Sequence, residues 1–167
     1  MIEGCYKSGL MALQTAGQVH VDVDRATAFD FVGDPIRLAL CIPGCKDLKE
    51  LSPGRYSATL TNQVAFITLS FKVIVEVTKI DSPNAIEATI TGDAIGLIGR
   101  VTANASLQLS EAGSNKTNIS YSADVSLAGK LGGLGEPVFR AKSAEVARNF
   151  GANVKAAIEK AAFETRV

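Results

Sequence analysis

Hydrophobic and polar residues alternate along most of the chain from Arg55 to Leu127, a pattern typical of long β-strands with one buried face. The apolar phase consists of Ile67, Leu69, Phe71, Val73, Val75 and Val77, then Ile86, Ala88 and Ile90, then Val101, Ala103, Ala105, Leu107 and Leu109, then Thr117, Ile119, Tyr121, Ala123, Val125 and Leu127. Short segments rich in Pro, Gly and Asn separate these runs, so we predict an antiparallel meander. The apolar phase contains no His, Asp, Glu, Lys or Arg.

One further strand and two short helices are predicted before this meander. Residues 13–23 alternate apolar and polar side chains and form the first strand. Asp24 caps a first helix, and the segment Gly33-Asp34-Pro35 ends it and starts a second one. We expect Ile36 and Leu40 to form the core side of the second helix.

The last element has the period of a helix. After Gly135, apolar or small residues recur at steps of three and four: Phe139, Ser143, Val146, Phe150, Val154, Ala157 and Ala161. About 28 residues at about 1.5 Å each make a rod of roughly 40 Å. The order of elements predicts an α+β helix-grip fold, in which a coiled antiparallel sheet wraps on a long C-terminal helix. We assign residues 13–167 to this single domain and residues 1–12 to a loose N-terminal leader.

Composition narrows the possible functions. The chain of 167 residues carries 17 Lys plus Arg and 17 Asp plus Glu, so it lacks the long-range field that would attract nucleic acid. Its 3 cysteines, an odd number without a secretory leader, favour a reducing compartment, and we expect a cytoplasmic protein. Polar residues interrupt the longest apolar stretch, so it lacks the ~20 continuous apolar residues of a transmembrane helix.

The predicted fold leaves apolar volume between helix and sheet. Strands of this length twist and coil, so their apolar face becomes concave, and one helix ~10 Å across covers the rim without filling the centre. We therefore predict a site for a small apolar ligand such as a quinone or a lipid, with no cofactor and no metal. Strand and helix phase give its predicted lining: Phe71, Ile90, Ala103, Tyr121, Phe139, Val146 and Phe150.

Two tyrosines and one asparagine share the phase of this apolar face. Tyr56, Tyr121 and Asn62 have the reach to orient a ligand carbonyl. The alternative is that they are core residues whose polar ends bond the backbone, which is the commoner outcome for a tyrosine on a strand.

Other chemistry-bearing residues are interpreted as structural. Cys41 and Cys45 lie in a Pro-Gly turn without further ligands, so neither a zinc site nor a redox pair is predicted. His20 falls on the hydrated face of its strand, which argues against a general base. The glycine-rich segment 129–135 lacks the Gly-Lys-Ser/Thr ending of a phosphate-binding loop, so we expect a sharp turn into the long helix.

Four short segments stand out in combination: Asp34-Pro35, Cys41-Ile42-Pro43-Gly44-Cys45, Gly54-Arg55-Tyr56 and Gly129-Lys130-Leu131-Gly132-Gly133-Leu134-Gly135. Together with the order of elements, they resemble the CoxG family, the G subunits of carbon monoxide dehydrogenase. The resemblance covers nearly everything after Ala12 and places the chain among the START and Bet v 1-like helix-grip domains. It implies a non-catalytic accessory protein of molybdenum hydroxylases of the carbon monoxide dehydrogenase type. Such a protein would bind a lipophilic molecule and connect the enzyme to the membrane and its quinone pool.

Three function hypotheses follow. The leading one is a carrier or adaptor that holds an apolar ligand without turnover. The second is a helix-grip enzyme of the cyclase or aromatase sort, which would need an acid or a base inside the cavity. The third is a pure interaction module whose interior is filled core. We expect at most weak peripheral membrane contact, because acidic residues of the last helix offset its basic ones: Glu136, Glu145, Glu159 and Glu164.

Overall fold

The computed structural model describes residues 11–129 and 135–166 and has the predicted helix-grip fold. The elements, in chain order, are β1 (Met11–Val21), α2 (Arg25–Val32), α3 (Pro35–Ala39), β2 (Cys45–Ser52), β3 (Arg55–Val64), β4 (Ile67–Asp81), β5 (Ala85–Ala94), β6 (Gly99–Gly113), β7 (Lys116–Gly129) and α4 (Glu136–Arg166). The strand β1 begins two residues before the predicted first strand. The rest of the predicted leader, and residues 130–134 of the glycine-rich segment, lie outside the described residues.

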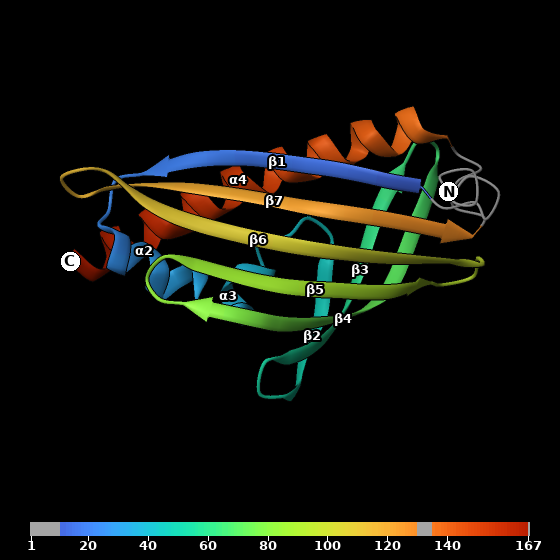
Figure 1. Cartoon of the computed structure of the whole chain (residues 1–167), viewed down its shortest axis with the longest axis horizontal. Coiled ribbons are helices and arrows are strands. Elements are labelled where there is room, and N and C mark those ends of the chain that lie inside the picture. Colours follow the sequence, from blue (N-terminus) through green and yellow to red (C-terminus); the bar gives the residue numbers. More distant parts are fainter. Residues whose placement is uncertain (1–10, 130–134, 167) are drawn as a thin grey trace, which may run out of the picture.

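The strands form one seven-stranded antiparallel sheet in the order β1-β7-β6-β5-β4-β3-β2. Figure 1 shows the long strands β1, β7, β6 and β5 side by side, while β3 and β2 cross them steeply, so the sheet is strongly curled. The helix α4 runs along β1 and makes smaller contacts with β3 and α2. The predicted meander and its closing helix are therefore confirmed, and α4 lies near one edge of the sheet.

The strand register aligns the apolar phase into transverse rows across the sheet. One row runs Tyr56, Val75, Ile90, Ala103 and Val125 from β3 to β7. The next row runs Val77, Ala88, Ala105, Ala123 and Thr15 from β4 to β1. Because side chains of one phase point to the same face of a sheet, these two central rows lie on the concave face.

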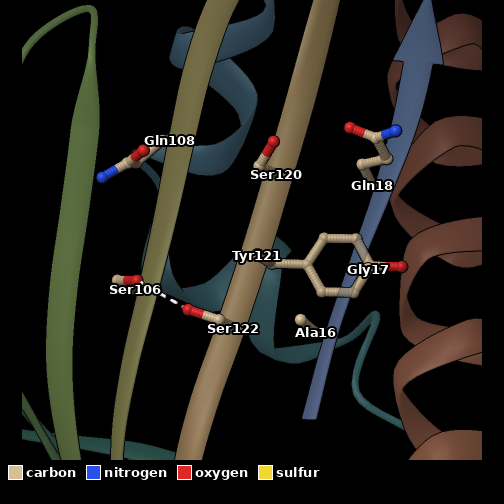
Figure 2. A pocket seen from close by; sticks show the side chains of 8 residues that line it. All are labelled: Ala16, Gly17, Gln18, Ser106, Gln108, Ser120, Tyr121 and Ser122. Atoms are coloured by element: carbon tan, nitrogen blue, oxygen red, sulfur yellow. Dashed lines mark hydrogen bonds between the residues drawn. The ribbon is translucent and has the colours of Figure 1, made fainter.

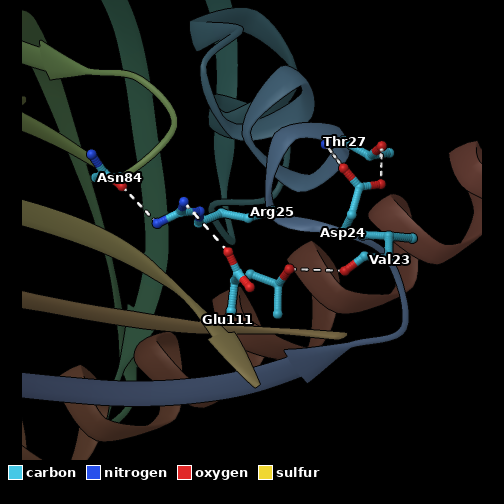
Figure 3. A network of polar contacts seen from close by, with 7 residues as sticks. Val23, Asp24, Arg25, Thr27, Asn84 and Glu111 are labelled. Atoms are coloured by element: carbon cyan, nitrogen blue, oxygen red, sulfur yellow. Dashed lines mark hydrogen bonds and ion pairs between the residues drawn. The ribbon is translucent and has the colours of Figure 1, made fainter. Parts of the chain in front are cut away.

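Polar contacts fix α2 to one end of the sheet (Figure 3). Arg25 donates to Asn84 Oδ1 on the β4–β5 turn at 2.8 Å and pairs with Glu111 of β6 at 3.6 Å. The carboxylate of Asp24 accepts from the backbone N–H and the hydroxyl of Thr27, which confirms Asp24 as the N-cap of α2. These contacts hold α2 over the end of the trough where β5 begins.

Two separate apolar clusters fill the two ends of the interior. The α2-end cluster contains buried residues of β1, α2, β7 and α4, among them Val21, Phe31, Ile119, Val154 and Ile158. The hairpin-end cluster contains Leu13, Val64, Leu69, Leu127 and Phe139.

The helix α3 buries a different side from the one predicted. Ile36 is 51% exposed and Leu40 is 70% exposed, whereas Leu38 packs against the α2-end cluster. The prediction for Ile36 and Leu40 is therefore wrong. The helix has only five residues, about one turn and a half, so its own periodicity does not define a buried face. The way the helix packs on its neighbours decides which side chain is buried.

Candidate functional site

The centre of the concave face belongs to neither apolar cluster. Val75, Ala88, Ile90, Ala105 and Ala123, from the two central rows, are half-buried and pack against neither the α2-end nor the hairpin-end cluster. Ala103, between Ile90 and Val125, is 8% exposed and is likewise in neither cluster. We call these six residues the apolar floor. Apolar side chains that remain accessible to water in the middle of a concave face are a surface on which an apolar molecule can be buried.

The small size of the floor residues is a second feature of this surface. Ala88, Ala105 and Ala123 are direct cross-strand partners on β5, β6 and β7. Larger residues stand on either side of this line, Ile90 on β5 and Leu107 on β6. Because three alanines share one transverse row, the floor has less side-chain volume there than at the neighbouring positions along the strands. The sequence contained this signal, because all three alanines fall in the apolar phase, but their alignment depends on the strand register.

The seven predicted lining residues divide into three groups. Ile90 and Ala103 are cross-strand partners on the floor, and Val146 of α4 is half-buried and in neither cluster. Phe139 belongs to the hairpin-end cluster, against which Phe71 packs. Tyr121 and Phe150 pack against the α2-end cluster. The aromatic residues therefore stand at the two borders of the floor.

Tyr121 joins the sheet to α4 (Figure 2). Its ring passes across Gly17 of β1, and its hydroxyl donates to the carbonyl of Ala147 at 3.0 Å. Phe150 packs edge-on against the ring, with the centroids 5.2 Å apart. A Cβ on Gly17 would lie 2.5 Å from Tyr121 Oη, and one on Gly151 would lie 2.9 Å from Tyr121 Cζ. Two glycines therefore make room for this tyrosine, and burial raises the pKa of its hydroxyl.

The predicted turn at residues 41–45 is a docking point rather than a reactive site. The Asn62 amide donates to Pro43 O at 3.2 Å, and the Asn153 amide of α4 donates to Cys41 O at 2.9 Å. Cys41 and Cys45 are free thiols, and burial raises the pKa of both, which disfavours the reactive thiolate. The turn thus connects β3 to α4.

The outer face of the sheet is polar. His20 is exposed there, as its strand phase predicted. A hollow over β1, β6 and β7 is lined mainly by serine and glutamine side chains of the polar phase (Figure 2). Within residues 11–129 and 135–166, no three His, Cys, Asp or Glu side chains gather as metal ligands.

Exposed apolar side chains gather at the end of the sheet where α4 begins. Phe66, on the β3–β4 turn, is 87% exposed, and Ile98, on the β5–β6 turn, is 72% exposed. The N–H of Ile95 donates to Ser70 O at 2.8 Å, which sets the β5–β6 turn beside the start of β4. The alternating pattern did not predict that these exposed side chains lie at the same end of the sheet, because they belong to the turns of two different hairpins.

None of the helices in the described parts of the chain has both the length and the apolar character needed to cross a membrane. Two acidic residues share the concave phase at its margins: Glu50 of β2 is the cross-strand partner of Tyr56, and Glu111 of β6, which pairs with Arg25, is the partner of Thr117. Elsewhere in the paired register of the described strands, this face carries none of the charged residue types that the apolar phase lacked. The side chain of Lys142 on α4 is 20% exposed and pairs with Glu145 at 3.0 Å.

Solved structures with the same fold are numerous. A conserved protein from Geobacillus kaustophilus superposes with a TM-score of 0.79 at 23% identity, covering 89% of this chain and 96% of that one. A START superfamily protein from Mycobacterium smegmatis gives 0.68 at 14% identity, with 88% and 97% covered. The Zhui aromatase/cyclase from a Streptomyces species gives 0.66 at 13% identity, with 90% and 95% covered. At these identities the likeness shows the fold alone.

The sequence comparisons point to one family. None of the curated proteins matches the chain. Residues 17–159, which run from β1 through most of α4, match the family described as CoxG, the G subunit of carbon monoxide dehydrogenase. The chain therefore belongs to the CoxG family of carbon monoxide dehydrogenase subunits.

Proposed function

We propose that this protein is a non-catalytic carrier that holds a small apolar molecule, such as a quinone or a lipid, between the apolar floor and α4. The observation that supports this most is the floor itself, since five of its six residues stay partly accessible to water although they lie at the centre of the concave face. Burying on the order of 300 Å² of ligand surface would contribute about 7 kcal/mol before the cost of association is subtracted. About 7 kcal/mol corresponds to a dissociation constant near 10 μM before that cost, so micromolar affinity requires a larger buried area or an additional directional contact.

The proposed ligand contacts Ile90, Ala103 and Val146 at the centre of the site. Phe71 and Phe139 form its border toward the hairpin-end cluster. Tyr121 and Phe150 form its border toward the α2-end cluster.

A non-catalytic role agrees with the chemistry of the floor. An enzyme of the aromatase/cyclase sort would need an acid or a base aimed at the ligand. The apolar floor supplies none, and the two acids that share its phase, Glu50 and Glu111, are exposed at its margins, Glu111 in an ion pair with Arg25. Lys142 is engaged by Glu145. The Zhui aromatase/cyclase shares the fold of this protein at 13% identity, which carries no argument for its reaction.

The family name suggests the partner. We propose that the protein works as a cytoplasmic accessory of a molybdenum hydroxylase of the carbon monoxide dehydrogenase type, to which it would bring or from which it would take the apolar ligand.

Native mass spectrometry of the purified protein, followed by solvent extraction, tests the carrier function. We expect a bound apolar molecule that is released into the organic phase. Titration of the extracted protein with a quinone should then raise its melting temperature and change its tyrosine emission, because Tyr121 borders the site. If no apolar molecule co-purifies and the titration changes neither property, the interior is filled core and the protein is an interaction module.

We also expect weak, peripheral contact with a lipid surface at the end where α4 begins. Phe66 and Ile98 project from separate hairpin turns, where fluid lipid can surround them. Of the described cations at this end, Arg100 pairs with Asp93 at 3.3 Å and Arg140 pairs with Glu136. The contact should therefore depend on apolar insertion and only slightly on anionic lipid.

Vesicle flotation measures this contact. A small fraction of the protein should float with phosphatidylcholine vesicles, and about the same fraction with vesicles that also contain phosphatidylglycerol. The double substitution Phe66→Ser with Ile98→Ser should abolish flotation. The control Phe163→Ser, which removes an exposed phenylalanine near the far end of α4, should leave it unchanged. Flotation that requires the anionic lipid, or that survives the double substitution, would contradict this expectation.

A further inference from the structure

Most polar side chains on the concave face of the strands are already engaged by the protein. They donate to backbone carbonyls in four pairs: Tyr121 to Ala147, Asn62 to Pro43, Thr117 to Val23 and Thr15 to Ser143. Such bonds fix the fold and leave these donors unavailable to a ligand. Of the three polar residues that the sequence offered as carbonyl-orienting groups, Tyr121 and Asn62 therefore have structural roles.

Tyr56 differs from the others. It is 7% exposed, yet within the described residues its hydroxyl has no hydrogen-bond partner. The one fully enclosed polar side-chain atom that lacks a partner in the described chain is Asn118 Oδ1, so Tyr56 Oη still borders accessible space. The Tyr56 ring is thus buried while its hydroxyl reaches accessible space without a protein partner, so the hydroxyl is free to donate a hydrogen bond to a bound molecule.

The position of Tyr56 places it in the proposed site. It stands at the β3 end of the transverse row that continues through Val75, Ile90 and Ala103. A molecule lying along this row would have apolar neighbours over most of its length and the Tyr56 side chain at one end.

The surroundings of Tyr56 keep its hydroxyl protonated. Burial, and then the negative charges of Glu50 and Asp34, raise the pKa of Tyr56 above its usual value. The group is therefore a hydrogen-bond donor at neutral pH. The same carboxylates would repel an anion at this end of the row.

We propose that Tyr56 positions the ligand by donating a hydrogen bond to a neutral acceptor oxygen, such as a carbonyl, at the end of an otherwise apolar molecule. The inference rests on the proposed carrier function and makes it more specific. It selects carbonyl-bearing apolar molecules over plain hydrocarbons and over fatty-acid anions.

Two probes that differ in their carbonyl groups test this inference. The probes are 2-methyl-1,4-naphthoquinone and 2-methylnaphthalene, titrated calorimetrically into wild-type protein and Tyr56→Phe. The phenylalanine keeps the ring and removes only the hydroxyl. We expect Tyr56→Phe to weaken quinone binding about tenfold and to change hydrocarbon binding less than twofold. Each probe is titrated into both proteins, so the ratio of the wild-type to the Tyr56→Phe affinity does not depend on how soluble that probe is in water.

Tyr121→Phe is the matched control. Its hydroxyl already bonds Ala147, so its removal should change the affinities for the two probes by the same factor. Melting curves of both variants verify that they are folded.

Each outcome has a distinct meaning. Equal effects of Tyr56→Phe on the two probes, or no effect, would overturn the role of Tyr56 while the carrier function stands. Failure of the wild-type protein to bind either probe would overturn both. Stronger binding of the quinone by Tyr56→Phe would show that the hydroxyl opposes the ligand.

Discussion

Replacing Gly151 by alanine will lower the free energy of unfolding by about 1–3 kcal/mol, although alanine is the better helix former by about 1 kcal/mol. The new Cβ would lie 2.9 Å from Tyr121 Cζ, still nearer to Tyr121 Oη, and 3.1 Å from Val19 Cγ1. The ring has little freedom to move, because Phe150 packs against it and Gly17 lies directly beneath it. Urea unfolding followed by far-UV circular dichroism measures the effect.

Repeating the Gly151→Ala substitution in a variant without the tyrosine ring separates the steric clash from any general effect of the substitution on the helix. In Tyr121→Leu the ring is absent, and there Gly151→Ala should be neutral or should stabilise the helix by up to about 1 kcal/mol. A loss of the same size in both backgrounds would show that Tyr121 is not the obstacle. Gly17→Ala should reproduce the loss from the β1 side, since its Cβ would lie 2.7 Å from two ring carbons of Tyr121.

Filling the apolar floor will remove ligand binding while the protein remains folded. In Ala105→Leu the larger side chain occupies the middle of the alanine row, between its partners Ala88 and Ala123. We expect the affinity for an apolar ligand to fall at least tenfold and the free energy of unfolding to change by less than about 1 kcal/mol, because the floor has room for the added carbons. Calorimetric titration with 2-methyl-1,4-naphthoquinone and urea unfolding measure the two quantities.

The neighbouring position on the same strand supplies the control. Asn104 is exposed in the opposite phase, so Asn104→Leu adds a leucine to the outer face and should leave ligand affinity unchanged. If Ala105→Leu binds the quinone as tightly as the wild-type protein, the ligand lies elsewhere. If it loses several kcal/mol of stability, the floor is packed core.

The strands, their faces and the closing helix were predictable from local pattern. Alternation with period two in residues 55–127 and recurrence at three and four after Gly135 correspond directly to β3–β7 and α4. The Asp24 cap was also predicted correctly, because a cap is satisfied within its own first turn. In contrast, the burial of Ile36 and Leu40 was predicted wrongly, since one short helix offers too few turns for its period to fix its orientation.

The candidate site was predictable only in part. Phase correctly put Ile90, Ala103 and Tyr121 on one face, but it could not show that Tyr121 is engaged by Ala147 or that the hydroxyl of Tyr56 is free. The bond of Tyr121 is made to a carbonyl 26 residues further along the chain, and the free state of Tyr56 follows from how the strands and turns pack around it. Gly17 and Gly151 carried no readable signal either, since their role is to leave space for a side chain on a third element.

The sequence by itself determined which residues of the meander become strands, which face of each is apolar, and that these apolar runs lack charged groups, because all of these follow from the spacing of side chains along one segment. Only the tertiary structure decided that Ala88, Ala105 and Ala123 form one row, that the two ends of the trough are packed while its centre stays accessible, and that one tyrosine keeps an unused hydroxyl. Strand register, sheet curl and the line along which α4 crosses the sheet set these features, and each arises from contacts between segments distant in the chain.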